Sequence, residues 1–167
     1  MLPKDMSGKL KSLDALTAIA AHARKQGQTV VFTNGCFDLV HRGHVHILRQ
    51  AKAAGDLLIV ALNSDQSVKE IKGPKRPIML EMDRIELIEA MEMVDYVVVF
   101  DDPDPTRLIA AIQPDVLVKG ADWIADKVVG AELVEKSGGR VIRIPYLQGF
   151  STSEIIERIV KQNGENL

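Results

Sequence analysis

Short apolar runs rich in Val and Ile alternate with amphipathic stretches along most of the chain. Runs that are apolar throughout are typical of strands buried on both faces, whereas the stretches between them carry apolar residues at helical spacing. The pattern predicts five strands, at residues 29–33, 56–62, 95–100, 116–119 and 140–144.

The stretches between these runs predict helices with plausible starts. Ser12, Ser64 or Asp65, and Asp104 are expected caps, and Pro105 is expected in the first turn that follows Asp104. The predicted helices cover residues 12–26, 41–54, 64–71, 81–91, 104–113, 130–136 and 151–162. The last helix is expected to turn three isoleucines inward, namely Ile155, Ile156 and Ile159.

Alternating strands and helices predict an α/β fold with a five-stranded parallel sheet that is doubly wound and Rossmann-like. A length of 167 residues suits a single domain. We expect a loose polar leader and the first helix in residues 1–27, the main domain in 28–162 and a short tail in 163–167. Ligands bind such sheets at the carboxyl ends of the strands, so the loops after the first, fourth and fifth strands are the expected site.

Composition narrows the possible partners and compartment. The formal net charge is −2, so no bulk attraction draws the chain to nucleic acid or to an anionic membrane, and neither is an expected partner. The one cysteine cannot form an internal disulfide, which suits a reducing compartment. The N-terminus lacks the apolar segment of a signal peptide, and the longest apolar run, residues 57–62, is too short to cross a bilayer. We therefore expect a cytoplasmic protein.

The loop after the first strand carries the residues most suggestive of chemistry. His41 and His44 are three residues apart at the start of a helix, where free backbone N–H groups and the helix dipole attract anions. Gly43 lies between them and would let a phosphate approach closely, and Gly35 would form the tight turn after the strand. The pattern predicts a phosphate site, although two incidental histidines on a capped helix remain the alternative.

Two further segments could bind anions. Ser151, Thr152 and Ser153 offer hydroxyl groups at the start of the last helix, although such residues also cap helices routinely. A basic loop with Lys69, Lys72, Lys75 and Arg76 follows the second strand, and it could either clamp phosphate or form a solvated surface. If it binds phosphate, Lys72 and Arg76 are the better candidates among these four, because glycine and proline stiffen their surroundings.

Three other features leave their alternatives open. The acidic residues near position 101 could bind a metal, but helix capping accounts for Asp104 more simply. Trp123 could contact a base or a sugar, or could anchor a loop. Cys36 has no evident general base, so we interpret it as a small loop residue rather than a nucleophile.

Together these segments resemble the cytidylyltransferase-like nucleotidyltransferases, whose signatures are a GxFD…HxGH loop and a late helix start rich in Ser and Thr. The resemblance extends over residues 29–159 and rests on GCFD at 35–38, HRGH at 41–44, KGAD at 119–122 and STS at 151–153. It implies a Rossmann-like sheet and transfer of a nucleotide from a nucleoside triphosphate to a phosphorylated acceptor, with release of pyrophosphate.

Within the family, TNGCFDLVHRGHV, ALNSDQSVKEIKGPKRPI and DVLVKGADW are similar to members that adenylylate a heptose 1-phosphate. This likeness implies ATP, with Mg²⁺, and D-glycero-β-D-manno-heptose 1-phosphate as substrates, and ADP-heptose for the lipopolysaccharide core as product. Such enzymes often follow a sugar-kinase domain, for which 167 residues leave no room, so a separate kinase is expected to supply the phosphate.

The residues and the resemblance together give the expected site. The expected catalytic residues are His41, His44 and Lys72. The expected nucleotide-binding residues are Asn34, Gly35, Cys36, Phe37, Gly43, Lys119, Asp122, Ser151, Thr152 and Ser153. No side chain is expected to form a metal site of the protein's own, and we expect a homodimer.

Two alternative functions remain open at this point. The same chemistry could use CTP and another alcohol phosphate, such as glycerol 3-phosphate, phosphoethanolamine or phosphopantetheine. A non-catalytic nucleotide sensor is the other, although a sensor has no need of both His41 and His44.

Overall fold

The computed structural model describes residues 8–121 and 128–164. Its elements are α1 (Leu13–Lys25), β1 (Val30–Gly35), α2 (Arg42–Ala53), β2 (Leu57–Asn63), α3 (Asp65–Lys72), α4 (Glu81–Glu89), β3 (Tyr96–Phe100), α5 (Thr106–Ile112), β4 (Val116–Ala121), α6 (Ala131–Lys136), β5 (Arg140–Pro145) and α7 (Thr152–Asn163). Each predicted strand is present, and most strand boundaries shift by only one or two residues.

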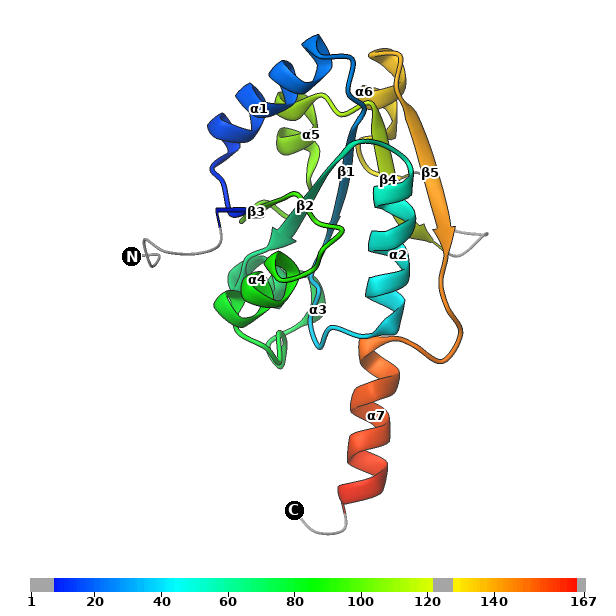
Figure 1. The fold of residues 1–167 in the computed structure, drawn as a ribbon. Coiled ribbons are helices and arrows are strands. Elements are labelled where there is room, and N and C mark those ends of the chain that lie inside the picture. The colour runs from blue at the N-terminus through cyan, green and yellow to red at the C-terminus, as the bar shows by residue number, and fades with distance from the viewer. Residues whose placement is uncertain (1–7, 122–127, 165–167) are drawn as a thin grey trace.

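The five strands form one parallel sheet in the order β3-β2-β1-β4-β5. The chain therefore winds outward from β1 in one direction through β2 and β3, and in the other through β4 and β5 (Figure 1). This order confirms the doubly wound, Rossmann-like sheet, and it places the reversal of winding between β1 and β4.

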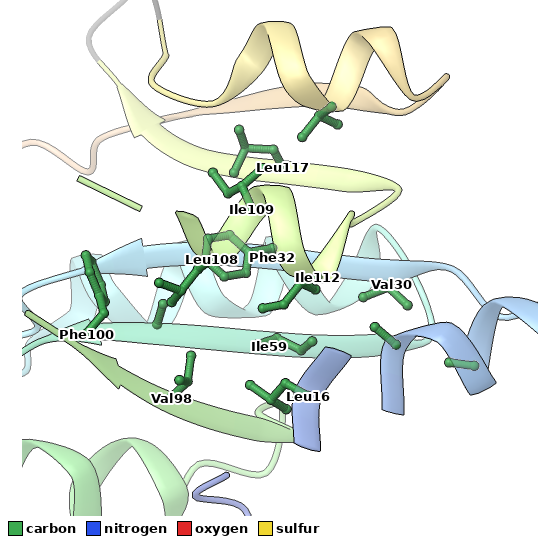
Figure 2. Packing of buried hydrophobic residues seen from close by; sticks show 14 residues of the cluster. Leu16, Val30, Phe32, Ile59, Val98, Phe100, Leu108, Ile109, Ile112 and Leu117 are labelled. Carbon is green, nitrogen blue, oxygen red and sulfur yellow. The ribbon is translucent and has the colours of Figure 1, made fainter. Parts of the chain in front are cut away.

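Successive side chains along each strand point to opposite faces of the sheet, and this alternation divides the hydrophobic core into two layers. Phe32 of β1 faces α1, α5 and α6, and Figure 2 shows it among Leu108, Ile109 and Leu117. Val31, its neighbour, belongs to the opposite layer beneath α2 and α4. Buried aliphatic residues on both faces of every central strand explain why the sequence shows continuous apolar runs.

Residues 9–11 are not a loose leader, contrary to the prediction. Leu10 forms an isolated parallel bridge with Val97 of β3, and its N–H donates to Glu89 Oε1 at 2.6 Å. The N–H of Lys11 donates to Val97 O at 2.9 Å. This segment covers part of the exposed edge of β3, so its polar composition reflects an edge position rather than a lack of structure.

Two helices differ from their predicted form. Helix α5 begins at Thr106, with Pro105 as the N-cap residue, although Asp104 Oδ1 still accepts the Thr106 N–H at 2.9 Å. Helix α7 extends away from the sheet (Figure 1), and none of its residues is buried. Ile155 and Ile156 are half-buried, whereas Ile159 is 50% exposed, so the predicted inward orientation is wrong for Ile159. Periodicity showed that one face is apolar but could not show whether anything covers it.

None of the helices in the described part of the chain is long and apolar enough to span a membrane.

Candidate active site

The predicted site residues of β1 and β4 meet where the winding reverses. Lys119 of β4 reaches across to β1, where its Nζ lies 3.2 Å from Asn34 Oδ1 and 3.4 Å from Asn34 O. Burial lowers the pKa of Lys119, with the charge of Lys72 acting in the same direction. The amide and carbonyl oxygens of Asn34 hold the ammonium at this edge, where it can still attract an anion.

The loop that leaves β1 has an unusual backbone. Phe37 and Leu39 both have φ of 49°, a left-handed conformation that costs roughly 1–2 kcal/mol at each non-glycine residue. The Phe37 side chain is 5% exposed, and its ring centroid lies 5.2 Å from that of His44. A Cβ at Gly35 would lie 3.2 Å from the Phe37 ring, so glycine gives the ring room to fold inward. Phe37 thus supports His44 from below.

Asp38 holds this loop in place from inside the protein. Its side chain is fully buried and accepts Arg76 Nε–H at 2.6 Å and the N–H groups of Ile78 and Met79 at 2.9 Å each. Burial by itself would raise the pKa of Asp38, but the Met79, Ile78 and Arg76 donors outweigh it and keep the pKa below its ordinary value. The sequence suggested Arg76 as a phosphate ligand of the basic loop. In the structure its guanidinium is paired with Asp38.

The two histidines form the start of α2. His41 is the N-cap residue, and its Nδ1 accepts the Gly43 N–H at 3.1 Å. His44 Nδ1 accepts the His41 N–H at 3.4 Å, and the two rings stack with centroids 3.8 Å apart. Because both Nδ1 atoms accept, each neutral ring carries its proton on Nε2. The pair therefore presents two N–H donors directed away from the helix backbone.

Burial keeps both rings neutral. It lowers the pKa of His44 to about 4, and the charge of His41 acts in the same direction. Burial also lowers the pKa of His41. At neutral pH the site therefore offers the hydrogen bonds of two uncharged imidazoles, and positive charge must come from lysines and helix N-termini.

The His44 pKa makes stability depend on pH. Protons bind to His44 in the unfolded chain near pH 6.5 but in the folded chain only near pH 4, so unfolding takes up a proton between these values. Lowering the pH from 6.5 to 4 should therefore remove roughly 2 to 3 kcal/mol of this residue's contribution to the unfolding free energy. Urea unfolding at a series of pH values should show a smaller slope for His44→Gln than for the wild type. Equal slopes would contradict the assignment.

Gly43 is required by protein contacts. A Cβ at Gly43 would lie 2.8 Å from Phe150 O and 2.8 Å from His41 Cε1. The structure shows that glycine at this position leaves room for the segment before α7, a packing role that the phosphate prediction did not include. Thr152 Oγ1 donates to Asp38 O at 2.7 Å, and the Arg42 guanidinium lies 5.3 Å from the centre of the Phe150 ring. The starts of α2 and α7 are thus packed together.

A Gly43→Ala substitution should disturb this packing. The new methyl group meets a backbone oxygen that cannot rotate away, so we expect a loss of about 1–3 kcal/mol in unfolding free energy and a large loss of turnover. Gly27→Ala is the control, because a Cβ there meets nothing within 4 Å although φ is +74°. It should cost stability through backbone strain and leave turnover unchanged. Equal turnover in the two variants would contradict the proposed packing role.

The three hydroxyl residues at the start of α7 have different contacts. Ser151 is the N-cap residue, and its Oγ accepts the Glu154 N–H at 3.1 Å. The Thr152 hydroxyl donates to the site loop, and Ser153 is exposed. The start of α7 therefore lies close to the histidines, as expected. The Thr152 hydroxyl proton, however, is donated to Asp38 O, and this hydrogen bond joins the start of α7 to the loop after β1.

Of the predicted residues that remain, Lys72 lies near Cys36. Lys72 is the last residue of α3, so it belongs to a helix end and not to the loop. Cys36 Sγ lies 3.9 Å from Asn63 Oδ1, and burial raises the pKa of its thiol despite the nearby charge of Lys72. A protonated thiol agrees with the interpretation of Cys36 as a non-nucleophilic loop residue. Asp122 and Trp123 lie outside the described residues.

Arg84 is a residue of this site that sequence reasoning missed. It is fully buried and donates to Cys36 O at 2.6 Å, to Asn63 O at 2.7 Å and to Asp65 Oδ1 at 2.9 Å. One guanidinium thus joins the ends of β1 and β2 beneath the loop. The sequence did carry a signal for the burial of Arg84. It is a charged residue on the apolar face of its helix, four positions before Ile88.

Within residues 8–121 and 128–164, no group of three or more His, Cys, Asp and Glu side chains is arranged to hold a metal ion. Asp102 pairs with Arg107 at 2.9 Å, and Asp104 accepts the N–H of Thr106. The Asp104 carboxylate thus binds the first N–H of α5, as the sequence suggested, although Pro105 holds the N-cap position.

Comparison with known proteins agrees with the signatures. The family model described as cytidylyltransferase-like matches residues 32–158. Curated relatives include bifunctional protein HldE of Geobacter sulfurreducens, 50% identical over 94% of this chain and 32% of the relative, and that of Geotalea uraniireducens, 50% identical over 93% of this chain and 32% of the relative. The chain thus spans about a third of the length of these relatives.

Two solved structures share the fold. A lipopolysaccharide core biosynthesis protein from Thermoplasma volcanium is 30% identical, with a TM-score of 0.59 over 72% of this chain and 98% of that chain. Pantoate-β-alanine ligase from Francisella tularensis has a TM-score of 0.61 over 93% of this chain and 75% of that chain. At 15% identity, the second likeness concerns the fold alone.

Proposed function

The chain belongs to the cytidylyltransferase-like family and is a nucleotidyltransferase, and on this premise we propose that it transfers AMP from ATP to D-glycero-β-D-manno-heptose 1-phosphate. The products are ADP-heptose, used in the lipopolysaccharide core, and pyrophosphate. The observation that carries the proposal is the pair of neutral, stacked histidines at the start of α2, each with its Nε2–H free of the helix backbone.

The chemistry needs position and charge neutralisation rather than a strong base. The second pKa of a phosphate monoester lies near 6, so the acceptor phosphate is already a nucleophile at neutral pH. One of its oxygens attacks the α-phosphorus of ATP, and the bond between that phosphorus and the oxygen bridging to the β-phosphate breaks. The electron pair leaves with pyrophosphate. Both reactants are anions, so the protein must offset their repulsion.

The histidines are placed to serve the leaving group. Negative charge grows on the phosphate oxygens as the bond breaks, and two preorganised N–H donors stabilise it without reorganisation. Neutral rings suit this role, because each already carries the Nε2 proton that it donates to a phosphate oxygen and needs no further proton from solvent. Lys119, Lys72 and the start of α2 supply the positive electrostatic potential.

The Mg²⁺ of this proposal accompanies the triphosphate. The Asp38 carboxylate belongs to the loop after β1, but it accepts three hydrogen bonds from the protein and is therefore a poor metal ligand. Phosphate oxygens and water would then hold most of the ion's coordination sites, as is common for Mg²⁺. Bound there, it shields charge on the phosphates.

Sequence likeness supports the choice of substrates. The stretches around the histidines, the basic loop and the end of β4 are similar to heptose 1-phosphate adenylyltransferases, and the protein from Thermoplasma volcanium is a lipopolysaccharide core biosynthesis protein by name.

Pyrophosphate release tests the substrate assignment. ATP, CTP, GTP and UTP are each offered with heptose 1-phosphate, glycerol 3-phosphate and phosphoethanolamine. We expect kcat/KM to be highest for ATP with heptose 1-phosphate, because a site with hydrogen bonds fitted to its substrate discriminates by large factors. A higher value for CTP with glycerol 3-phosphate would refute the substrates and leave the reaction class. No release with any pair would indicate a nucleotide sensor.

A further inference from the structure

Asn34 and Lys119 lie side by side near the ends of β1 and β4. The β1–β4 register pairs Thr33 with Val118, so Asn34 and Lys119 are the next residues along their strands. The Lys119 ammonium donates to two oxygens of this one residue, Oδ1 at 3.2 Å and the backbone O at 3.4 Å. Asn34 therefore fixes the ammonium between the two strands at which the winding of the sheet reverses.

Both of these oxygens are uncharged. Within residues 8–121 and 128–164, the ion pairs involve other basic side chains, and no carboxylate pairs with Lys119. Burial without a counter-charge disfavours an ammonium, and burial accordingly lowers the pKa of Lys119. A bound anion would supply the counter-charge that Asn34 does not.

We propose that Asn34 is a positioning residue, whose uncharged amide holds the Lys119 ammonium in place and leaves its positive charge for the triphosphate. The inference rests on the proposed function. It gives Asn34 a role that acts through Lys119, in place of the direct contact with the nucleotide that the sequence suggested.

The choice of asparagine over aspartate is the chemical point of the proposal. Aspartate has nearly the same shape and would form an ion pair with Lys119 at this position. The pair would favour the charged lysine and the folded chain, but it would cancel the positive potential and repel a polyphosphate. Asparagine holds the ammonium in the same place without cancelling its charge.

The substitution Asn34→Asp separates this role from a merely structural one. ATP and inorganic triphosphate are titrated into the full chain by calorimetry, and thermal unfolding is followed in parallel. We expect the dissociation constants of both probes to rise about 10-fold or more, because a charged hydrogen bond to phosphate is lost, while the melting temperature does not fall. A structural role alone predicts unchanged affinity in a chain that is at least as stable.

A double-mutant cycle tests whether Asn34 acts through Lys119. Asn34→Ala should weaken triphosphate binding about 3- to 10-fold in the wild-type chain, since the ammonium loses its side-chain acceptor. In a Lys119→Met background the same substitution should have no further effect, because the residue through which it acts is gone. Lys72→Met is the control background, in which the pair is intact and Asn34→Ala should keep its full effect.

The contrary results are distinct from one another. Additive losses for Asn34→Ala and Lys119→Met would indicate direct contact between Asn34 and the phosphates and would overturn the inference. Wild-type affinity in Asn34→Asp, or a lower melting temperature, would also overturn it. In each of these cases the proposed function would stand. A wild-type chain that binds neither ATP nor triphosphate would overturn the proposed function and this inference together.

Discussion

Replacing either His41 or His44 by Ala should lower kcat by roughly two to four orders of magnitude while ATP still binds. The physical reason is the pair of Nε2–H donors left free when both Nδ1 atoms accept backbone N–H groups. Their hydrogen bonds strengthen as charge moves onto the leaving pyrophosphate, so their loss falls on turnover more than on ground-state binding. Steady-state kinetics together with ATP binding separate the two effects.

Capping must be distinguished from catalysis at His41, because the residue also caps α2. Asn is a favourable N-cap residue but lacks the imidazole donor, so His41→Asn should keep stability and still lose turnover. His46→Ala, two residues further along the same helix than His44, is the matched control and should retain full activity. Near-normal turnover in His41→Asn or in His44→Ala would remove that histidine from the chemistry.

Arg84→Met should cost about 3–5 kcal/mol of unfolding free energy. The guanidinium is fully buried, and its removal leaves the carbonyls of Cys36 and Asn63 and the carboxylate of Asp65 without this donor. Methionine fills a similar volume, so the loss reports on the polar contacts rather than on a cavity. Denaturant unfolding measures it.

Arg107→Met is the matched control for this substitution. Arg107 also pairs with an aspartate at 2.9 Å, but its side chain is 66% exposed and that of Asp102 is 40% exposed. An exposed pair contributes about 0–1 kcal/mol, so this variant should unfold almost like the wild type. Comparable losses in the two variants would contradict the account of Arg84 as the support of the loop after β1.

The sheet could be predicted because burial on both faces leaves a simple signal. Continuous apolar runs such as residues 57–62 arise only when helices cover both faces, and the helix between each pair of runs then fixes a parallel order. The helix start at the two histidines could be predicted because its sequence signals are local. His41 and His44 are close in sequence, and the start of a helix attracts anions through its own backbone N–H groups, without any contact from a distant segment.

What could not be predicted depends on contacts between distant segments. The apolar stripe of α7 looks like a buried face in the sequence, yet the helix projects from the molecule. Gly43 is required by Phe150, more than a hundred positions away, and Arg76 is bound by Asp38 of another loop. Periodicity and local motifs carry no information about such partners.

The most direct test of nucleotidyl transfer follows the oxygens of the acceptor. Heptose 1-phosphate labelled with ¹⁸O on its phosphate is incubated with ATP, and the products are analysed by mass spectrometry. Attack of the acceptor phosphate on the α-phosphorus predicts that ADP-heptose retains all of the label and that pyrophosphate contains none. Label in pyrophosphate or in inorganic phosphate, or release of ADP in place of pyrophosphate, would contradict the account.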